Sequence, residues 1–422
     1  MRSTRWGASS PRAEPNVVWN VVSGAATKLG EQLANPGTVL PWVLGALAAP
    51  AGLVGLLVPV KDAGSLLPQL AVAGRIRSAQ RRAPWWVASA LLQSLALASM
   101  AAAVAVLAGV WAGLTVVSAL ALFSVASGVG SVAFKDVIAK TVPSGSRGSV
   151  LAWRATLGGL LGVAAGLVLR GGVAQSDERM PYVVLLVAAA GAFVFAAAAF
   201  ARIREPAGEA AEPRDALAEA RSGLDALGRY PAFRAFVVAR ALLLALPLAV
   251  PFVTLYGQQR VDATLGGLGV FVIANAVAAS LSSPFWGRFA DLASHRAMAL
   301  AGALGVLAVC YALAVGVAPD ALRSATLYAP AFVIAGVAHG GIRLGRKTYL
   351  VDGSPDDERP TYVAIANTSI GAATLVGAAI GASAGVVGAS GVLVAFAACM
   401  AFGSLLAWRL PPADTMIDAR AD

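Results

Sequence analysis

The sequence predicts an all-α polytopic membrane protein, with twelve transmembrane helices arranged as two pseudo-symmetric six-helix bundles. Hydrophobic residues make up 58% of the 422 residues, charged residues only 13%, and the mean hydropathy is +0.74. A soluble globular protein does not have this composition. Apolar runs of about 20 residues, enough to cross a bilayer core of about 30 Å, follow one another along the chain. Because these runs are continuous rather than alternating, a transmembrane barrel is excluded.

An internal repeat predicts the two-fold organisation. Residues 127–162 resemble residues 338–371, and a shift of 212 residues superposes Lys135 on Lys347 and Arg147 on Arg359. The chain therefore reads as two copies of one unit.

Twelve spans fit this pattern. The first, second and fourth are weaker by hydropathy because each contains charged residues. An alternative merges the first two spans into one near 38–60, but a shift of 213 places residues 16–38 on 229–251, which is a clear span. The predicted spans are 16–38, 51–74, 85–108, 112–138, 148–170, 181–201, 231–256, 265–287, 297–318, 325–349, 360–383 and 388–409.

Loop charges predict that both termini are cytoplasmic. Twenty-one Lys and Arg residues flank the spans on the side of the N-terminus, and four lie on the other side. Positive residues concentrate on the cytoplasmic side of a membrane, so we expect a bacterial-type inner-membrane protein. The net charge of +10 then reflects topology and contact with anionic lipid, and it requires no nucleic-acid partner. The N-terminal segment lacks the apolar run of a signal peptide and is expected to be retained.

The expected organisation is an N-terminal bundle at 1–201, a cytoplasmic linker at 202–230, a C-terminal bundle at 231–410 and a cytoplasmic tail at 411–422. Pro213 could open a linker helix along the membrane surface, either as a plain tether or with a regulatory role.

The two cysteines, Cys310 and Cys399, match no metal or redox spacing and are expected in the core. No metal site and no cofactor are predicted.

Six spans, a polar linker and six further spans resemble the major facilitator superfamily, whose halves are related by an axis along the membrane normal. That family carries a motif of the form G-x-x-x-D-R-x-G-R-R between helices 2 and 3, and again between helices 8 and 9. Both loops of this chain keep part of it, with the two glycines 213 residues apart. The matching positions are Gly74, Arg82, Gly287, Asp291 and Arg296.

The resemblance implies a conformational latch, because this loop is thought to hold the halves together on the cytoplasmic side in the family. In the first copy, Ser78 stands where the acidic residue is expected. Lys135 and Lys347, which the repeat relates, are assigned to the same latch. The alternative is that the basic residues of these loops only orient the chain.

Charges inside the spans are functional candidates, because a charge at bilayer depth is costly unless it is paired or faces water. The spans at 85–108, 181–201 and 297–318 contain no Lys, Arg, Asp or Glu, and 388–409 has only Arg409 at its end. The resemblance implies that these four helices form an outer support. The other eight helices would line a central cavity. Six of them carry charges, and the spans at 265–287 and 360–383 carry the polar residues Asn275 and Asn367.

One pair of cations is related by the repeat, since a shift of 212 carries Lys28 onto Arg240. Facing each other across a cavity, they would attract one anionic substrate. The arrangement resembles the phosphate-binding arginine pair of organophosphate antiporters in the superfamily. The alternative is that Lys28 is neutralised by Glu31, one turn away, and Arg240 by another carboxylate. The substrate-binding candidates are Lys28, Lys61, Arg154, Arg240, Asn275, Arg343 and Asn367.

Three carboxylates, Glu31, Asp62 and Asp136, are the proton-coupling candidates, since a carboxylate that exchanges partners between conformers gains and loses a proton. Static pairs with Lys28 and with Lys135 are the alternative for Glu31 and Asp136. His339 is expected to pack among glycines rather than to relay protons.

These patterns predict a monomeric secondary active transporter that moves a small anionic or zwitterionic solute by alternating access, coupled to protons or a counter-substrate. An alternative is proton-coupled efflux of lipophilic or cationic compounds through the three carboxylates. Alternatives of another class are a membrane-embedded sensor and a lipid-modifying enzyme. Catalysis is disfavoured because no HExxH or G-x-S-x-G motif stands in a span.

Overall fold

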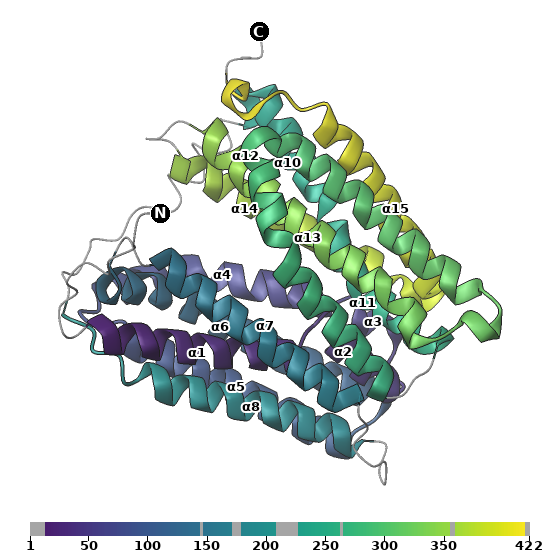
Figure 1. Ribbon diagram of the computed structural model, residues 1–422, viewed down its shortest axis with the longest axis horizontal. Helices are drawn as coiled ribbons and strands as arrows, with labels where there is room; N and C mark the ends of the chain where they lie inside the picture. Colours follow the sequence, from purple (N-terminus) through teal and green to yellow (C-terminus); the bar gives the residue numbers. More distant parts are fainter. Residues whose placement is uncertain are drawn as a thin grey trace, which may run out of the picture.

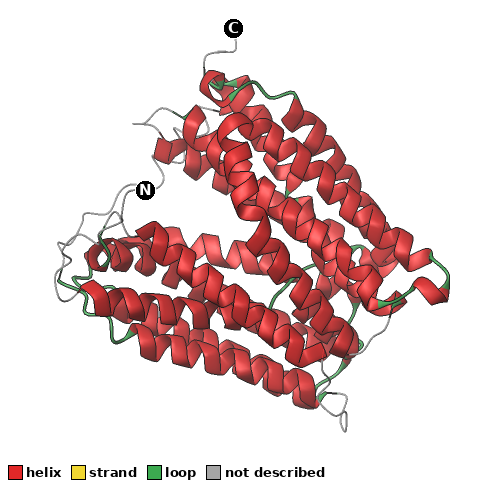
Figure 2. Cartoon of the chain, viewed as in Figure 1, coloured by secondary structure: helices red, strands yellow, loops and turns green. Residues whose placement is uncertain are grey.

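The computed structural model describes residues 13–143, 147–170, 179–207, 227–261, 265–354 and 359–417. Within these residues the chain is helical, with loops and turns between the helices and no strand (Figure 2). The predicted all-α fold is therefore confirmed. The predicted linker helix at Pro213 lies outside the described residues.

The helices of the first half correspond to the first six predicted spans. The first span is broken, because Pro36 has no backbone N–H to donate and the side chain of Asn35 takes over the local hydrogen bonds. Its Oδ1 accepts from the backbone N–H of Gly37 at 2.8 Å and of Thr38 at 3.1 Å. The helices are α1 (Ala13–Leu33), α2 (Val39–Ala46), α3 (Ala51–Val54), α4 (Leu57–Ser78), α5 (Ala83–Val106), α6 (Gly109–Thr141), α7 (Arg147–Arg170) and α8 (Met180–Phe200).

The second half follows the remaining six spans. Its eighth and ninth spans run together in α12 and are separated only by a break at Ala293, whose φ of −159° and ψ of 79° are not helical. In α13, the N-cap Ser324 accepts from the backbone N–H of Leu327 at 3.2 Å. The helices are α10 (Pro231–Leu243), α11 (Ala245–Arg260), α12 (Leu265–Val317), α13 (Ala325–Gly353), α14 (Arg359–Ala382) and α15 (Ala384–Trp408), with 3-10 turns η2 (Asp320–Leu322) and η3 (Ala413–Thr415).

The merged span near 38–60 is wrong, because residues 47–50 form a turn between α2 and α3, where Ala48 has φ of 53°. Nine helices in the described part are long and apolar enough to cross a membrane by length and composition. The fourth predicted span, α6, is among them despite its charges. The first, second and eighth spans are not, although each is helical.

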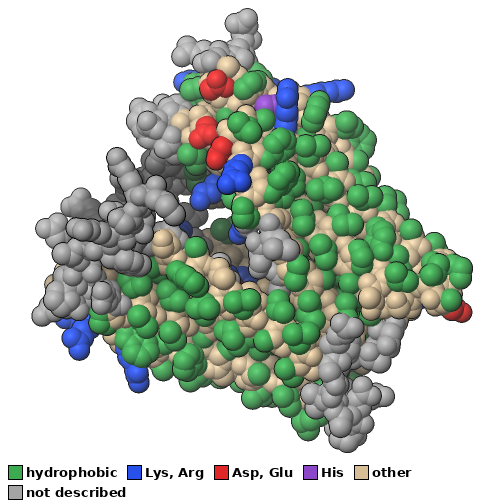
Figure 3. Space-filling model, in the orientation of Figure 1, with side chains coloured by type: hydrophobic (Ala, Val, Ile, Leu, Met, Phe, Trp, Pro, Cys, Tyr) green, Lys and Arg blue, Asp and Glu red, His purple; other side chains and the backbone are tan. Residues whose placement is uncertain are grey.

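Lipid contact explains the outer surface. Large apolar side chains are exposed along α7, α8 and α15, among them Leu160, Phe195 and Phe402, and apolar side chains cover much of the face seen in Figure 3. Cys310 is also exposed and Cys399 is half-buried, so the core placement expected for Cys310 is wrong. Burial inside the protein and contact with lipid require the same apolar residues, and sequence does not distinguish them.

The helices form two groups that meet at one end and diverge at the other (Figure 1). We call the end where α2, α3 and α11 meet the closed end. The end where α1 begins and α15 ends is the open end. Across the groups, α7 packs against α12, α4 and α3 pack against α14, and α11 packs against α2.

Hydrogen bonds between the halves hold the closed end. The buried Thr254 hydroxyl donates to the carbonyl of Gly37 at 2.6 Å, and Gln258 Nε2 donates to the carbonyl of Trp42 at 2.9 Å. Gly37 lies in the break at Pro36, where its carbonyl has no place in a helix, and Trp42 lies in α2, the short helix that follows the break.

Two glycines let the halves approach at the closed end. A Cβ on Gly381 of α14 would lie 2.8 Å from the Cα of Gly55, and a Cβ on Gly55 would lie 2.5 Å from the carbonyl carbon of Gly381. These are backbone atoms, so no side-chain rotation relieves the contact.

We expect Gly381→Ala to lower the thermal unfolding midpoint of the detergent-solubilised protein, because the overpacked contact costs about 1–3 kcal/mol. Gly371→Ala on the same helix is the matched control, since nothing lies within 4 Å of a Cβ there. Equal midpoints for the two variants would show that the glycine contact does not hold the closed end.

Candidate functional site

A cavity of about 450 Å³ lies between the two halves. Its walls come from the break between α1 and α2, from α4, from α10 and α11, and from α13. Figure 3 shows the surface hollowed between the halves, with Lys and Arg side chains inside the hollow. The polar and charged lining residues are Asn35, Asp62, Arg240, His339, Arg343 and Arg346.

Helix α13 presents a polar face to this cavity. His339, Arg343 and Arg346 stand at positions i, i+4 and i+7, which share one face of a helix. The other face carries glycines that allow close packing on α12, since a Cβ on Gly341 would lie 2.6 Å from the Cβ of Ala301 and one on Gly345 would lie 2.8 Å from Met298. His339 therefore lines the cavity rather than packing among the glycines. The i, i+4, i+7 spacing was the signal that could have added His339 and Arg346 to the candidates.

Arg240 enters the cavity from α10 and is 8% exposed. Its Nη2 donates to Asn367 Oδ1 of α14 at 2.9 Å, and no ion pair of the described residues includes it. Its Nε is buried without a hydrogen-bond partner in the part of the chain described. A buried guanidinium with an unused donor favours the arrival of an acceptor.

Among the described residues, Asp62 of α4 is the one carboxylate lining this cavity. It interacts electrostatically with its neighbour Lys61 and, across the cavity, with Arg346. Three arginines of the second half thus face a single carboxylate of the first half, and the cavity carries excess positive charge.

Lys28 does not line the cavity that holds Arg240. Its Nζ lies 2.6 Å from Glu31 Oε2, one turn along α1. The structure therefore shows Lys28 neutralised by Glu31, which was the alternative to the cation pair. Since residues three apart are neighbours on a helix, α1 supplies this partner locally.

Arg154 and Lys61 both interact electrostatically with the carboxylate of Glu31. Arg154 Nη1 donates to the carbonyl of Asn20 at 2.9 Å, and its guanidinium lies 4.2 Å from the Phe134 ring centroid. Gly24 makes room for this side chain, since a Cβ there would lie 2.3 Å from Arg154.

Other substrate candidates are placed less closely. Lys61 Nζ lies 5.9 Å from the ring centroid of Phe123. Asn275 belongs to α12, and its side chain lies outside the described part of the structure.

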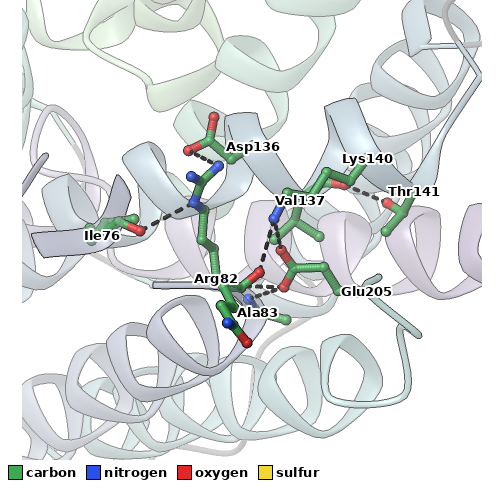
Figure 4. A network of polar contacts seen from close by, with 9 residues as sticks. Ile76, Arg82, Ala83, Asp136, Val137, Lys140, Thr141 and Glu205 are labelled. Atoms are coloured by element: carbon green, nitrogen blue, oxygen red, sulfur yellow. Dashed lines mark hydrogen bonds and ion pairs between the residues drawn. The ribbon is translucent and has the colours of Figure 1, made fainter. Parts of the chain in front are cut away.

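A second cluster of charges lies at the open end of the first half (Figure 4). Arg82 Nη1 lies 3.0 Å from Asp136 Oδ2, so Asp136 pairs with a residue from the preceding loop and not with its neighbour Lys135. Arg82 Nε also donates to the carbonyl of Ile76 at 3.1 Å. This pairing places Asp136 outside the cavity of Arg240.

Glu205 organises the cluster and was missed by sequence reasoning, which placed it in the polar linker. Its side chain is 2% exposed. Oε2 accepts from the backbone N–H groups of Arg82 and Ala83 at 2.7 Å each, and Oε1 accepts from Lys140 Nζ at 2.9 Å. The carboxylate satisfies free donors at the N-terminus of α5 and interacts favourably with the helix dipole. The residue that caps α5 lies more than 100 residues away in the sequence, so no local sequence pattern indicates the cap.

The latch motif forms no ion pair between the halves in the described residues. Asp291 is exposed, and Arg296 lies 5.7 Å from the ring centroid of Trp408 in its own half. Lys135 and Lys347 are exposed as well, and nothing lies within 4 Å of a Cβ on Gly287. Gly74 belongs to α4, which ends four residues later. The halves are apart at this end, so the latch stays a prediction.

Comparisons with known proteins agree with this architecture. The family model described as Major Facilitator Superfamily matches residues 258–420. No curated protein matches the sequence.

Solved structures are similar over nearly the whole chain. A point mutant of the nucleoside transporter NupG has a TM-score of 0.71 at 11% identity, covering 94% of this chain and 99% of that one. A D-xylose-proton symporter has a TM-score of 0.64 at 14% identity, covering 95% and 98%. A bacterial homolog of the human lysosomal transporter Spinster, inward-facing and unoccupied, has a TM-score of 0.68 at 13% identity, covering 98% and 100%.

Two helical groups around a charged cavity, with helices apolar and long enough to cross a membrane, define an integral membrane protein with the fold of these solved transporters. The family model matches the second half of the chain, and the solved transporters share its fold along nearly the whole length.

We expect Glu205→Ala to destabilise the protein by about 3 kcal/mol, because Lys140 and two backbone N–H groups lose a buried partner. The measurement is the thermal unfolding midpoint in detergent. Asp320→Ala is the control, since Asp320 pairs with Arg323 at 3.0 Å but is 95% exposed and should leave the midpoint unchanged. A midpoint for Glu205→Ala equal to that of the control would contradict the assigned role.

Proposed function

We propose that this chain moves a small anionic or zwitterionic solute across the inner membrane by alternating access, with both termini in the cytoplasm. The observation that carries the proposal is the excess of arginine over carboxylate in the cavity between the halves. Arg240, Arg343 and Arg346 face Asp62 alone.

The chemistry of these side chains supports an anion. Guanidinium groups present fixed forks of donors that match carboxylate and phosphate groups. Like charges held together in a poorly solvated cavity repel one another, so an entering anion relieves that repulsion. Asn367 holds one edge of Arg240 in place and so orients the guanidinium before the solute arrives.

The first-half cations act on the path of the solute rather than at the centre of the site. Lys28 is 52% exposed although it lies within the first predicted span, so it faces water in the opening between the halves. Lys61 and Arg154 share the field of Glu31 with it. These residues raise the local concentration of anions near the cavity.

The conformation described here is inward-facing in this proposal. The open end carries the basic loops that the charge bias places in the cytoplasm, and the fold resembles a transporter structure described as inward-facing. Closing this end would bring the latch loops of the two halves together, with Arg82 and Gly74 on one side and Asp291, Arg296 and Gly287 on the other. Lys135 and Lys347 stand near the same end.

Proton coupling is assigned to Asp62. Glu31 is paired with Lys28 and Asp136 with Arg82, whereas Asp62 has its interaction across the cavity with Arg346. An anion that binds Arg346 competes with Asp62, and a carboxylate that loses its cationic partner gains affinity for a proton.

We expect Arg240→Gln and Arg343→Gln each to reduce uptake of the transported anion into proteoliposomes by at least about tenfold, because each removes charge-assisted hydrogen bonds of roughly 1.5–3 kcal/mol. Uptake is measured with a panel of labelled anions, zwitterions and cations. Arg234→Gln is the matched control, since Arg234 is exposed on the same helix as Arg240 and does not line the cavity. Selective uptake of cations, unaffected by the arginine variants, would favour the efflux alternative instead.

We expect Asp62→Asn to abolish the stimulation of uptake by an inward proton gradient while preserving exchange of labelled for unlabelled solute. The amide cannot take up a proton, whereas exchange requires only the binding site and its reorientation. Asp320→Asn serves as the control. Proton coupling through Asp62 is ruled out if gradient stimulation survives in the Asp62 variant.

A further inference from the structure

A second hollow, of about 680 Å³, lies on the first half at the open end, away from the central cavity. It is bounded by the start of α1, the loop before α5, the end of α6, the start of α7 and the segment after α8. Its basic lining residues are Arg81, Lys140, Arg147 and Arg204, and its only carboxylate is Glu205.

The positive charge of this hollow is not neutralised within the described residues. Glu205 is already engaged by Lys140 and by the N-terminus of α5. No described ion pair includes Arg81 or Arg204, and both are exposed. Arg147 donates to the carbonyls of Val142 at 3.1 Å and Ala139 at 2.6 Å, contacts that fix its guanidinium but supply no counter-charge.

An apolar hollow adjoins the basic one. It measures about 560 Å³ and shares Arg81, Arg204 and Glu205 with it. Its other walls come from the first residues of α5 and the last residues around α8. They are Ala83, Pro84, Val87, Ala201 and Ile203. A basic compartment joined to an apolar one fits an amphiphile with an anionic head.

Aromatic residues place these hollows at headgroup depth. Arg202 lies 4.7 Å from the ring centroid of Trp19, and Trp153 is 58% exposed on α7, the helix that begins at Arg147. Tryptophan gathers where the hydrocarbon core meets the headgroups, so the ligand that reaches this site most readily is a lipid.

The basic hollow is not a product of the internal repeat. The shift of 212 residues carries Lys140 onto Asp352, and the shift of 213 carries Arg81 onto Ser294 and Arg204 onto Ile417. The second half has the same topology but keeps only one of the four basic residues, because Arg147 corresponds to Arg359. Three of the four basic residues of this hollow are therefore specific to the first half.

We propose that the two hollows form a binding site for an anionic phospholipid. Arg81, Arg147 and Arg204 hold the phosphate, and the glycerol and acyl portion lies in the groove between α5 and α8. Basic pockets on the cytoplasmic side of membrane proteins recognise anionic headgroups in this way. Glu205 closes the floor of the site through its bond to Lys140.

Native mass spectrometry of the purified full-length protein tests the proposal, with phosphatidylglycerol and phosphatidylcholine as probes. We expect preferential retention of phosphatidylglycerol, weakened about tenfold in the double variant Arg81→Gln/Arg204→Gln because two cations near the phosphate are lost. The control Arg234→Gln/Arg409→Gln removes the same charge at exposed positions of the other half and should retain the lipid.

Further arms separate the lipid site from general electrostatics and from folding. The charge-conserving variant Arg81→Lys/Arg204→Lys should restore most of the binding, and inorganic phosphate at the same concentration should not displace the lipid. Equal retention of the two lipids, or an equal loss in the control pair, would overturn the proposal. Full displacement by inorganic phosphate would also overturn it, because the site would then take a free anion.

Discussion

Arginine side chains held at membrane depth without matching carboxylates are the constraint on which the structure depends. Arg240, Arg343 and Arg346 share one cavity with Asp62 alone, and a charge in hydrocarbon is tolerated only where water, a partner or a ligand meets it. The two helical groups satisfy this requirement by diverging at one end, which keeps the cavity open to water. They meet at the other end through Gly55, Gly381 and hydrogen bonds to the carbonyls of Gly37 and Trp42.

The two halves use the same topology with different chemistry. In the first half, Glu205 follows α8, caps the N-terminus of α5 and binds Lys140. After α15 in the second half, Met416 is fully buried, and a Cβ on Gly353 at the end of α13 would lie 3.0 Å from it. The buried ion pair of the first half thus corresponds to apolar packing in the second half. A buried ion pair needs matched partners and adds specificity more than stability, which fits a half that also carries an unneutralised basic surface.

The charged residues of the molecule fall into three separate sets. The arginines of the second half line the central cavity, the pair formed by Lys28 and Glu31 lies on α1, and the cluster of Arg82 with Asp136 lies at the open end. Within the described residues of these three sets, only Arg240 in the first set has a buried guanidinium donor without a hydrogen-bond partner. Each of the other two has a carboxylate that satisfies it within its own half.

The sequence by itself determined the helical membrane fold, the order of the spans and the repeat that relates the halves, because apolar run length and a constant shift are local and countable. It also determined that six of the eight spans expected to line the cavity carry charged residues. The tertiary structure decided which groups these charged side chains contact. Asp136 pairs with Arg82 rather than with adjacent Lys135, Glu205 caps a helix far from it in sequence, and His339 faces the cavity rather than the glycines around it. Each outcome depends on which helix faces lie together, and hydropathy does not distinguish a face toward lipid from one toward protein.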